Sequence, residues 1–219
     1  MKILISLATA LFGIVLFLGV TDGAHAAGGS PCGSASSRAA GQVEADLQVQ
    51  VSQVVACATF VVVDGNLTRT IDIVALDLEE NYYSDSVVQV NEISTRNGKH
   101  FSNFIGYAFL QSGEFTSAEG YAQLNASVDL CRLNGKYQPV GKCRATVLDL
   151  DWVPEYSARS IDQEMETIDG CVITRTITNT IWGGTASGSI GGTDVSSPTG
   201  QVQEIRVTED YGPGCVIIF

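Results

Sequence analysis

From residue 122 to residue 130 the chain reads Ala-Gln-Leu-Asn-Ala-Ser-Val-Asp-Leu, with an apolar side chain at every second position. The same alternation returns between residues 146 and 152. Successive side chains of a β-strand point to opposite faces, so a period of two predicts strands with one buried face. The two runs have matched phase and flank a segment bounded by Cys131 and Cys143, which predicts a hairpin whose end these cysteines bridge. A bridge that closes so short a loop contributes roughly 3 kcal/mol.

Strand-like runs continue on both sides of this hairpin. An Asn97-Gly98 pair separates two of them, and both residue types tolerate the positive φ of a tight hairpin turn. Tyr156–Ile168 is the one stretch whose apolar residues have roughly helical spacing, and this spacing is compatible with a short helix. Ile190–Gly200 is rich in Gly and Ser and predicts a loop. About ten short strands with regular turn signals predict an all-β fold. We expect an antiparallel β-sandwich of jelly-roll or immunoglobulin-like type, with a barrel as the second choice.

The amino terminus has the features of a secretory signal. A basic Met1-Lys2 start precedes an apolar stretch from Ile3 to Val20, and Ala24-His25-Ala26 forms a small-residue cleavage site. Eighteen apolar residues are also just long enough for a membrane anchor, but the cleavage site favours removal. We therefore expect a signal peptide over residues 1–26, a flexible Gly/Ser/Ala leader over 27–41 and a single β-domain over 42–219. The mature protein is expected to be secreted or periplasmic, without a membrane span.

Charge and cysteine content narrow the class of partner. The chain has 12 Lys and Arg against 24 Asp and Glu, and losing Lys2 and Asp22 with the signal leaves the net charge at −12. This field repels polyanions, which argues against nucleic acid and anionic membranes. All six cysteines lie after the cleavage site, an arrangement that predicts three disulfides in an oxidising compartment. Fifteen pairings are possible, and only the one between Cys131 and Cys143 is favoured by the pattern.

The segment between these two cysteines is the strongest candidate for a binding loop. Its basic residues surround one tyrosine, and no acidic residue occurs from position 130 to 148. A stapled, basic, aromatic-bearing loop on an acidic protein predicts a recognition site, although a solvated hairpin end would have the same composition. The candidate binding residues are Arg132, Lys136, Tyr137, Lys142 and Arg144.

Other candidate sites are weaker. The residues Tyr82, Tyr83, Tyr156 and Trp182 are candidates for a sugar-stacking surface. If cleavage followed Ala24, an amino-terminal His25 and His100 together would suit copper, as in copper-dependent polysaccharide monooxygenases. No nucleophile, phosphate-binding or zinc motif occurs, and Asp149 and Asp151 are expected to face water. We predict no metal and no cofactor.

These patterns predict an exported, acidic binding or surface-interaction protein without catalytic activity, whose partner is a protein or carbohydrate outside the cell. One alternative is a self-assembling fibre subunit that adds a terminal strand, Val43–Val51 or Cys215–Phe219, to a neighbour's sheet. Another is a secreted polysaccharide-active enzyme that uses copper. Glycosylation sequons at Asn66 and Asn125 matter only in a eukaryotic host.

Overall fold

The computed structural model describes residues 51–80, 83–110, 113–136, 138–168, 170–212 and 215. Within these residues the secondary structure consists of strands, and the prediction of an all-β fold is confirmed. Most of Val43–Val51 and Cys215–Phe219 lies outside the described residues. The strands are β1 (Val51–Asp64), β2 (Leu67–Glu80), β3 (Tyr83–Arg96), β4 (Lys99–Phe109), β5 (Glu114–Ala118), β6 (Tyr121–Arg132), β7 (Arg144–Ile168), β8 (Cys171–Ile190) and β9 (Thr193–Tyr211).

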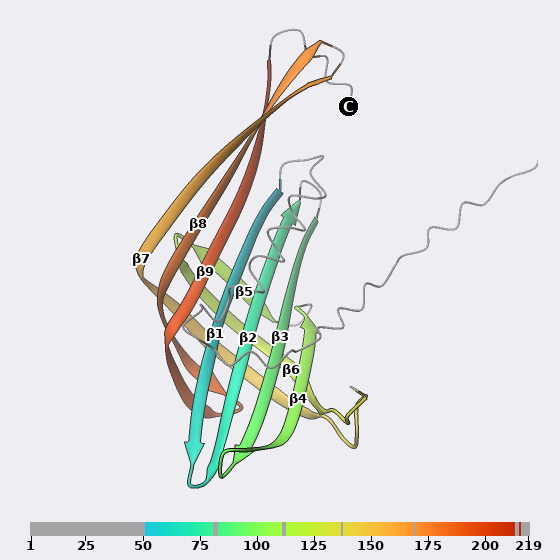
Figure 1. Ribbon diagram of the computed structural model, residues 1–219, viewed down its shortest axis with the longest axis vertical. Helices are drawn as coiled ribbons and strands as arrows, with labels where there is room; N and C mark the ends of the chain where they lie inside the picture. Colours follow the sequence, from blue (N-terminus) through green and yellow to red (C-terminus); the bar gives the residue numbers. More distant parts are fainter. Residues whose placement is uncertain are drawn as a thin grey trace, which may run out of the picture.

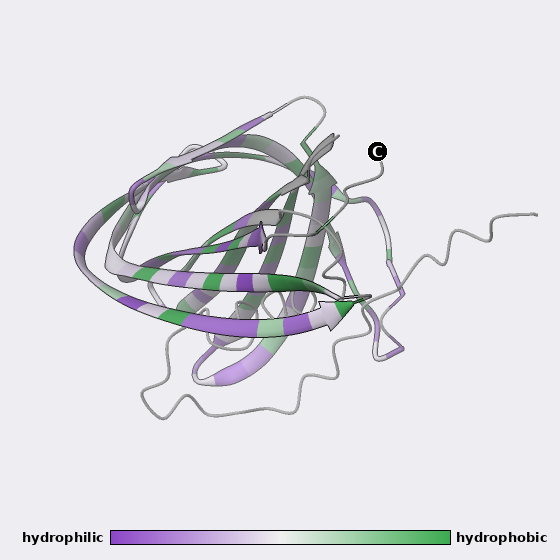
Figure 2. Ribbon diagram, turned by 90° about the horizontal axis from the view of Figure 1, so that it is seen from above, coloured by the Kyte–Doolittle hydropathy of each residue, from purple (hydrophilic) through white to green (hydrophobic). Residues whose placement is uncertain are grey.

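All nine strands belong to one antiparallel sheet with the order β4-β3-β2-β1-β9-β8-β7-β6-β5. Strands that follow one another in the chain are neighbours, except for β4 and β5, which lie at the two ends of this order. β1 also pairs with β9, which joins the first strand to the last. The two ends of the sheet meet where β4 also pairs with β6, so the strands enclose an interior and the arrangement is barrel-like (Figures 1 and 2). Within the described part of the chain, no helical segment has the length and apolarity needed to cross a membrane.

The enclosed core contains the alternating residues that the sequence singled out. Leu124 and Leu130 of β6 and Leu148 and Leu150 of β7 are fully buried, and along both strands the buried residues alternate with exposed ones. Trp152 extends the same row, and its Nε1 donates a hydrogen bond of 2.9 Å to the backbone oxygen of Cys57. Because β8 and β9 separate β7 from β1 in the sheet order, this bond crosses the interior. A buried indole N–H needs such a partner.

The seam between β4 and β6 is narrow. Only Phe104 and Ile105 of β4 pair with β6. An ion pair spans this seam, because Arg144 of β7 donates to Glu92 of β3 at 2.8 Å. Glu92 is 2% exposed and lies opposite Ile71 in the register, so its side chain faces the core. The Arg144 guanidinium also lies 5.2 Å from the centroid of the Phe104 ring, which places it over the seam.

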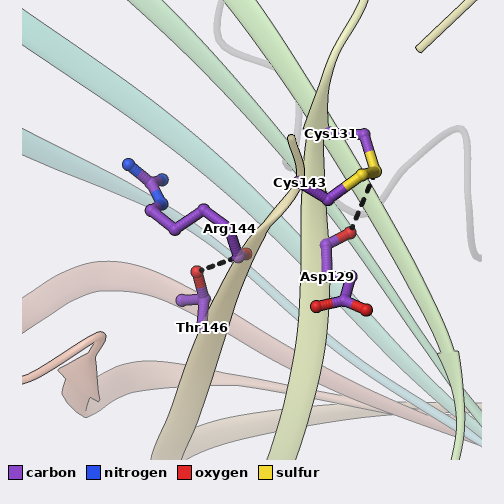
Figure 3. Close-up of a disulfide and its surroundings, with 5 residues drawn as sticks. All are labelled: Asp129, Cys131, Cys143, Arg144 and Thr146. Carbon is purple, nitrogen blue, oxygen red and sulfur yellow. Dashed lines mark hydrogen bonds between the residues drawn. A yellow bond between two sulfur atoms is a disulfide. The ribbon is translucent and has the colours of Figure 1, made fainter. Parts of the chain in front are cut away.

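The predicted bridge between Cys131 and Cys143 is confirmed, and it closes the loop beside this seam (Figure 3). A second disulfide joins Cys171 to Cys215. Cys57 is disulfide-bonded as well, and Cys32 is the one cysteine outside the described residues. The Asn97-Gly98 hairpin is also confirmed, with φ values of 53° and 73°.

Two local predictions were wrong. Tyr156–Ile168 belongs to the strand β7 and not to a helix, because β8 offers it an unbroken pairing partner along its whole length. The expected loop at Ile190–Gly200 shrinks to the turn Gly191-Gly192, where both glycines have positive φ, and β9 begins at Thr193. As a result, β7, β8 and β9 are three long strands. Their outer parts extend beyond the pairing of β9 with β1 as a projecting three-stranded arm, defined as residues 162–168, 171–177 and 207–211 (Figure 1).

We predict that Arg144→Ala lowers the free energy of unfolding by about 2–3 kcal/mol, because it leaves the buried Glu92 carboxylate without its charged partner. Urea denaturation measures the change. Lys142→Ala, a neighbouring exposed cation, is the matched control and should change stability by less than about 0.5 kcal/mol. Equal effects of the two substitutions would contradict the role of the ion pair across the seam.

Candidate functional site

The structure places the predicted binding loop at the end of the sheet opposite the arm (Figure 1). Arg132, Lys136 and Lys142 are exposed. Tyr137 lies outside the described residues. The side chain of Arg144 extends away from the disulfide (Figure 3) and is held by Glu92, so it belongs to the seam.

The backbone of this loop is well fixed. Asn134 Oδ1 accepts hydrogen bonds from the backbone N–H groups of Lys136 and Gln138 at 2.8 and 3.1 Å. Leu133 and Pro139 form an isolated bridge across the loop. Together with the disulfide, these contacts present three exposed cations on a stiff support.

The proposed aromatic surface does not form from the residues that can be placed. Trp182 and Gly183 are adjacent in β8 and therefore face opposite sides of the sheet. Trp182 faces the interior, whereas the ring of Tyr156 lies against Gly183 on the outer side. Tyr82 and the side chain of Tyr83 lie outside the described part of the chain.

The structure also locates the residues considered for metal binding or acid–base chemistry. His100 is exposed near the start of β4, and His25 lies outside the described residues. Among the residues that are described, no group of three His, Cys, Asp or Glu side chains is placed to hold a metal ion. Asp149 and Asp151 are both exposed on β7, as expected.

A cavity that the sequence did not suggest lies at the end of the sheet from which the arm projects. We call it the mouth pocket. Val54, Asp77 and Glu204 oppose one another in β1, β2 and β9, so their side chains share one face. Val202 lies two residues before Glu204 on that face and packs in the core, which identifies it as the inner face. The pocket has a volume of about 530 Å³ and lies directly above the core.

One wall of the mouth pocket is formed by β5 and the turn that leads into β6. Phe115 of β5 is 8% exposed and lines the pocket together with the Glu119-Gly120 turn. Gly120 has φ +84° and lies against the indole of Trp182, since a Cβ built on it would be 2.3 Å from Cγ of that ring. The turn thus covers part of the Trp182 ring, and only glycine fits this approach.

The lining of the mouth pocket is mixed in polarity and acidic in balance. Three carboxylates, Asp77, Glu119 and Glu204, face one guanidinium, Arg206. Arg206 donates to Glu204 at 2.9 Å, and Ser86 donates to Asp77 at 2.6 Å. The apolar part consists of Val54, Phe115, Trp182 and Val202. Sequence reasoning missed this site because its residues come from five strands, and no local spacing links them.

A separate cluster of charges holds the arm together. Arg175 of β8 donates to Glu209 of β9 at 2.7 Å and to Glu166 of β7 at 3.3 Å, so one guanidinium ties all three strands. Burial alone would raise the pKa of the Glu209 carboxyl. Hydrogen bonds from Arg175 and Tyr211 outweigh this effect and lower the pKa below its ordinary value of 4.5. The disulfide between Cys171 and Cys215 fastens the tip of the arm.

We predict that the arm loosens in acid. A carboxyl whose pKa is lowered in the folded state stabilises the fold above its ordinary pKa of 4.5, and this stabilisation is lost as the pH falls through the lowered value. Amide hydrogen-exchange protection in the arm strands β8 and β9 should therefore fall as the pH drops below 4.5. Glu209→Gln should lower protection at neutral pH and remove this pH dependence. Asp210→Asn, the exposed neighbour, is the control, and an equal change in that variant would refute the role of Glu209.

We also predict that Gly120→Ala destabilises the fold by about 1–2 kcal/mol, because a Cβ at this φ is strained and meets the Trp182 ring. Tryptophan emission and urea denaturation report the change. Gly135→Ala is the matched control, since a Cβ there meets nothing within 4 Å. A neutral Gly120→Ala substitution would show that the turn does not rest on the indole.

Comparisons with protein families, with characterised proteins and with solved structures found no match to this chain. The function must therefore be argued from the geometry of its sites.

Proposed function

We propose that this chain is an exported, non-catalytic binding protein that holds a small organic cation in the mouth pocket. The observation that carries the proposal is the lining of that pocket, where the Trp182 indole and three carboxylates surround a space of about 530 Å³. Ligand sites typically occupy concave, partly apolar spaces of this size with a few convergent polar groups, and the mouth of a closed sheet is a common place for them.

The charge of the lining favours a cationic ligand. The described lining residues comprise three carboxylates and one guanidinium, a formal charge of −2. Arg206 pairs with Glu204 among them. An aromatic face adds a further attraction for cations, because its quadrupole presents negative charge. A ligand with a compact positive group and a small apolar part would satisfy both features. An anionic ligand would meet repulsion.

The disulfides support the extracytoplasmic part of the proposal. The bonds between Cys131 and Cys143 and between Cys171 and Cys215 belong to a chain in which Cys57 is also oxidised. Such bonds persist in oxidising compartments and are rare in reducing ones.

Choline tests the ligand class, with 3,3-dimethyl-1-butanol as its uncharged analogue of equal shape. Isothermal titration of the full mature chain should show choline binding with a Kd of about 1 mM or tighter. The neutral analogue should bind at least about ten-fold more weakly, because it lacks the charge. Asp77→Asn and Glu204→Gln should each weaken choline binding about ten-fold, which corresponds to about 1.4 kcal/mol.

Asp149→Asn removes an exposed carboxylate outside the pocket and is the matched control. It should leave choline binding unchanged. Equal affinity for choline and its neutral analogue would refute the proposal, as would binding that survives both carboxamide substitutions.

A further inference from the structure

The arm exposes an open strand edge. β6 pairs with β7 only along residues 144–152, and beyond them β7 pairs, among the described residues, with β8 alone. From Glu155 to Ile168 every residue is exposed, so solvent reaches both faces of this stretch. Natural proteins usually shorten or cover such edges, because their unpaired backbone groups attract other chains.

The edge is acidic on one face. Asp162, Glu164 and Glu166 alternate along β7 and therefore point to the same side of the arm. Arg159, the one basic residue between Glu155 and Ile168, falls on the opposite face. Arg175 offsets Glu166 through the contact of 3.3 Å. Asp162 and Glu164 are exposed members of the same acidic row.

The arm is reinforced despite its exposure. A short sheet with little packing on its faces is marginal in water. In the arm such packing occurs at the base, where Ile177 and Val207 join Ile205 in a small buried cluster. Here the Arg175 ion pairs join the three strands, and the bond between Cys171 and Cys215 fastens the tip. These features keep the arm extended and hold the acidic row in a fixed geometry.

The complementary surface occurs on the same chain. Arg132, Lys136 and Lys142 are exposed on the stapled loop, and no acidic residue lies between positions 130 and 148. The chain has a net charge of −12, and the positive charge of this loop is complementary to the acidic edge. The arm projects from one end of the long axis, and the loop lies toward the other end (Figure 1). The loop and the arm of one molecule therefore do not contact each other.

We propose that copies of this chain associate head to tail, with the basic loop of one copy, residues 131–143, docked on the acidic row of the next copy's arm, Asp162, Glu164 and Glu166. Each copy offers one loop and one arm. The contact is heterologous, so repetition produces a chain of subunits or a closed ring. A small, charge-dominated interface makes the association weak and sensitive to salt. This inference is independent of the mouth pocket and of its ligand.

Sedimentation velocity on the full mature chain at about 100 µM tests the association. The wild type should form oligomers at about 20 mM salt and dissociate at about 500 mM, where the Debye length is short. Lys136→Glu with Lys142→Glu makes both surfaces acidic, and Asp162→Lys with Glu164→Lys makes both basic. Each double variant should be monomeric alone, and an equimolar mixture of the two should assemble, because every loop then meets an arm of opposite charge.

Asp149→Lys with Asp151→Lys is the matched control, with the same charge change and spacing in the paired part of β7. It should assemble like the wild type. Circular dichroism and melting should show that every variant is folded. A wild type that stays monomeric at low salt, assembly that survives either double reversal, or a mixture that fails to assemble would each overturn the proposal.

Discussion

The closure of the sheet depends on a contact of two residue pairs between β4 and β6, and the ion pair between Glu92 and Arg144 holds that contact in place. A carboxylate that is 2% exposed is costly unless it is paired, so each partner constrains the other. Because Glu92 belongs to β3 and Arg144 to β7, the pair joins the strands on either side of the seam. The stacking of Arg144 over Phe104 places the cation at the join itself.

The two ends of the closed sheet differ because of this seam. At the end with Arg144, side chains from β3, β4 and β7 meet and fill the interior. Toward the other end β6 pairs with the short strand β5, and the turn after β5 reaches the Trp182 ring. The space that remains between this turn and β1, β2 and β9 is the mouth pocket.

Sequence reasoning recovered the features that are encoded locally. The alternation along β6 and β7, the Asn97-Gly98 turn and the bond between Cys131 and Cys143 each depend on residues close in the chain. It failed at Tyr156–Ile168, where the spacing of the apolar residues was compatible with a helix and pairing with β8 decided the outcome. It did not predict the contact of Arg144 with Glu92, because Glu92 lies 52 positions earlier. The mouth pocket was out of reach for the same reason, since tertiary pairing alone brings its strands together.

The pairing of β1 with β9 has a consequence for how the chain reaches its native state. Cys57 lies opposite Gln201, so the first described strand acquires its second neighbour only when nearly the whole polypeptide is present. Contacts between such distant segments cost chain entropy before favourable interactions compensate for it. They therefore lower the folding rate. A ribosome-bound chain that still lacks the last strand cannot complete the sheet. Until β9 has emerged, one edge of β1 lacks its strand partner.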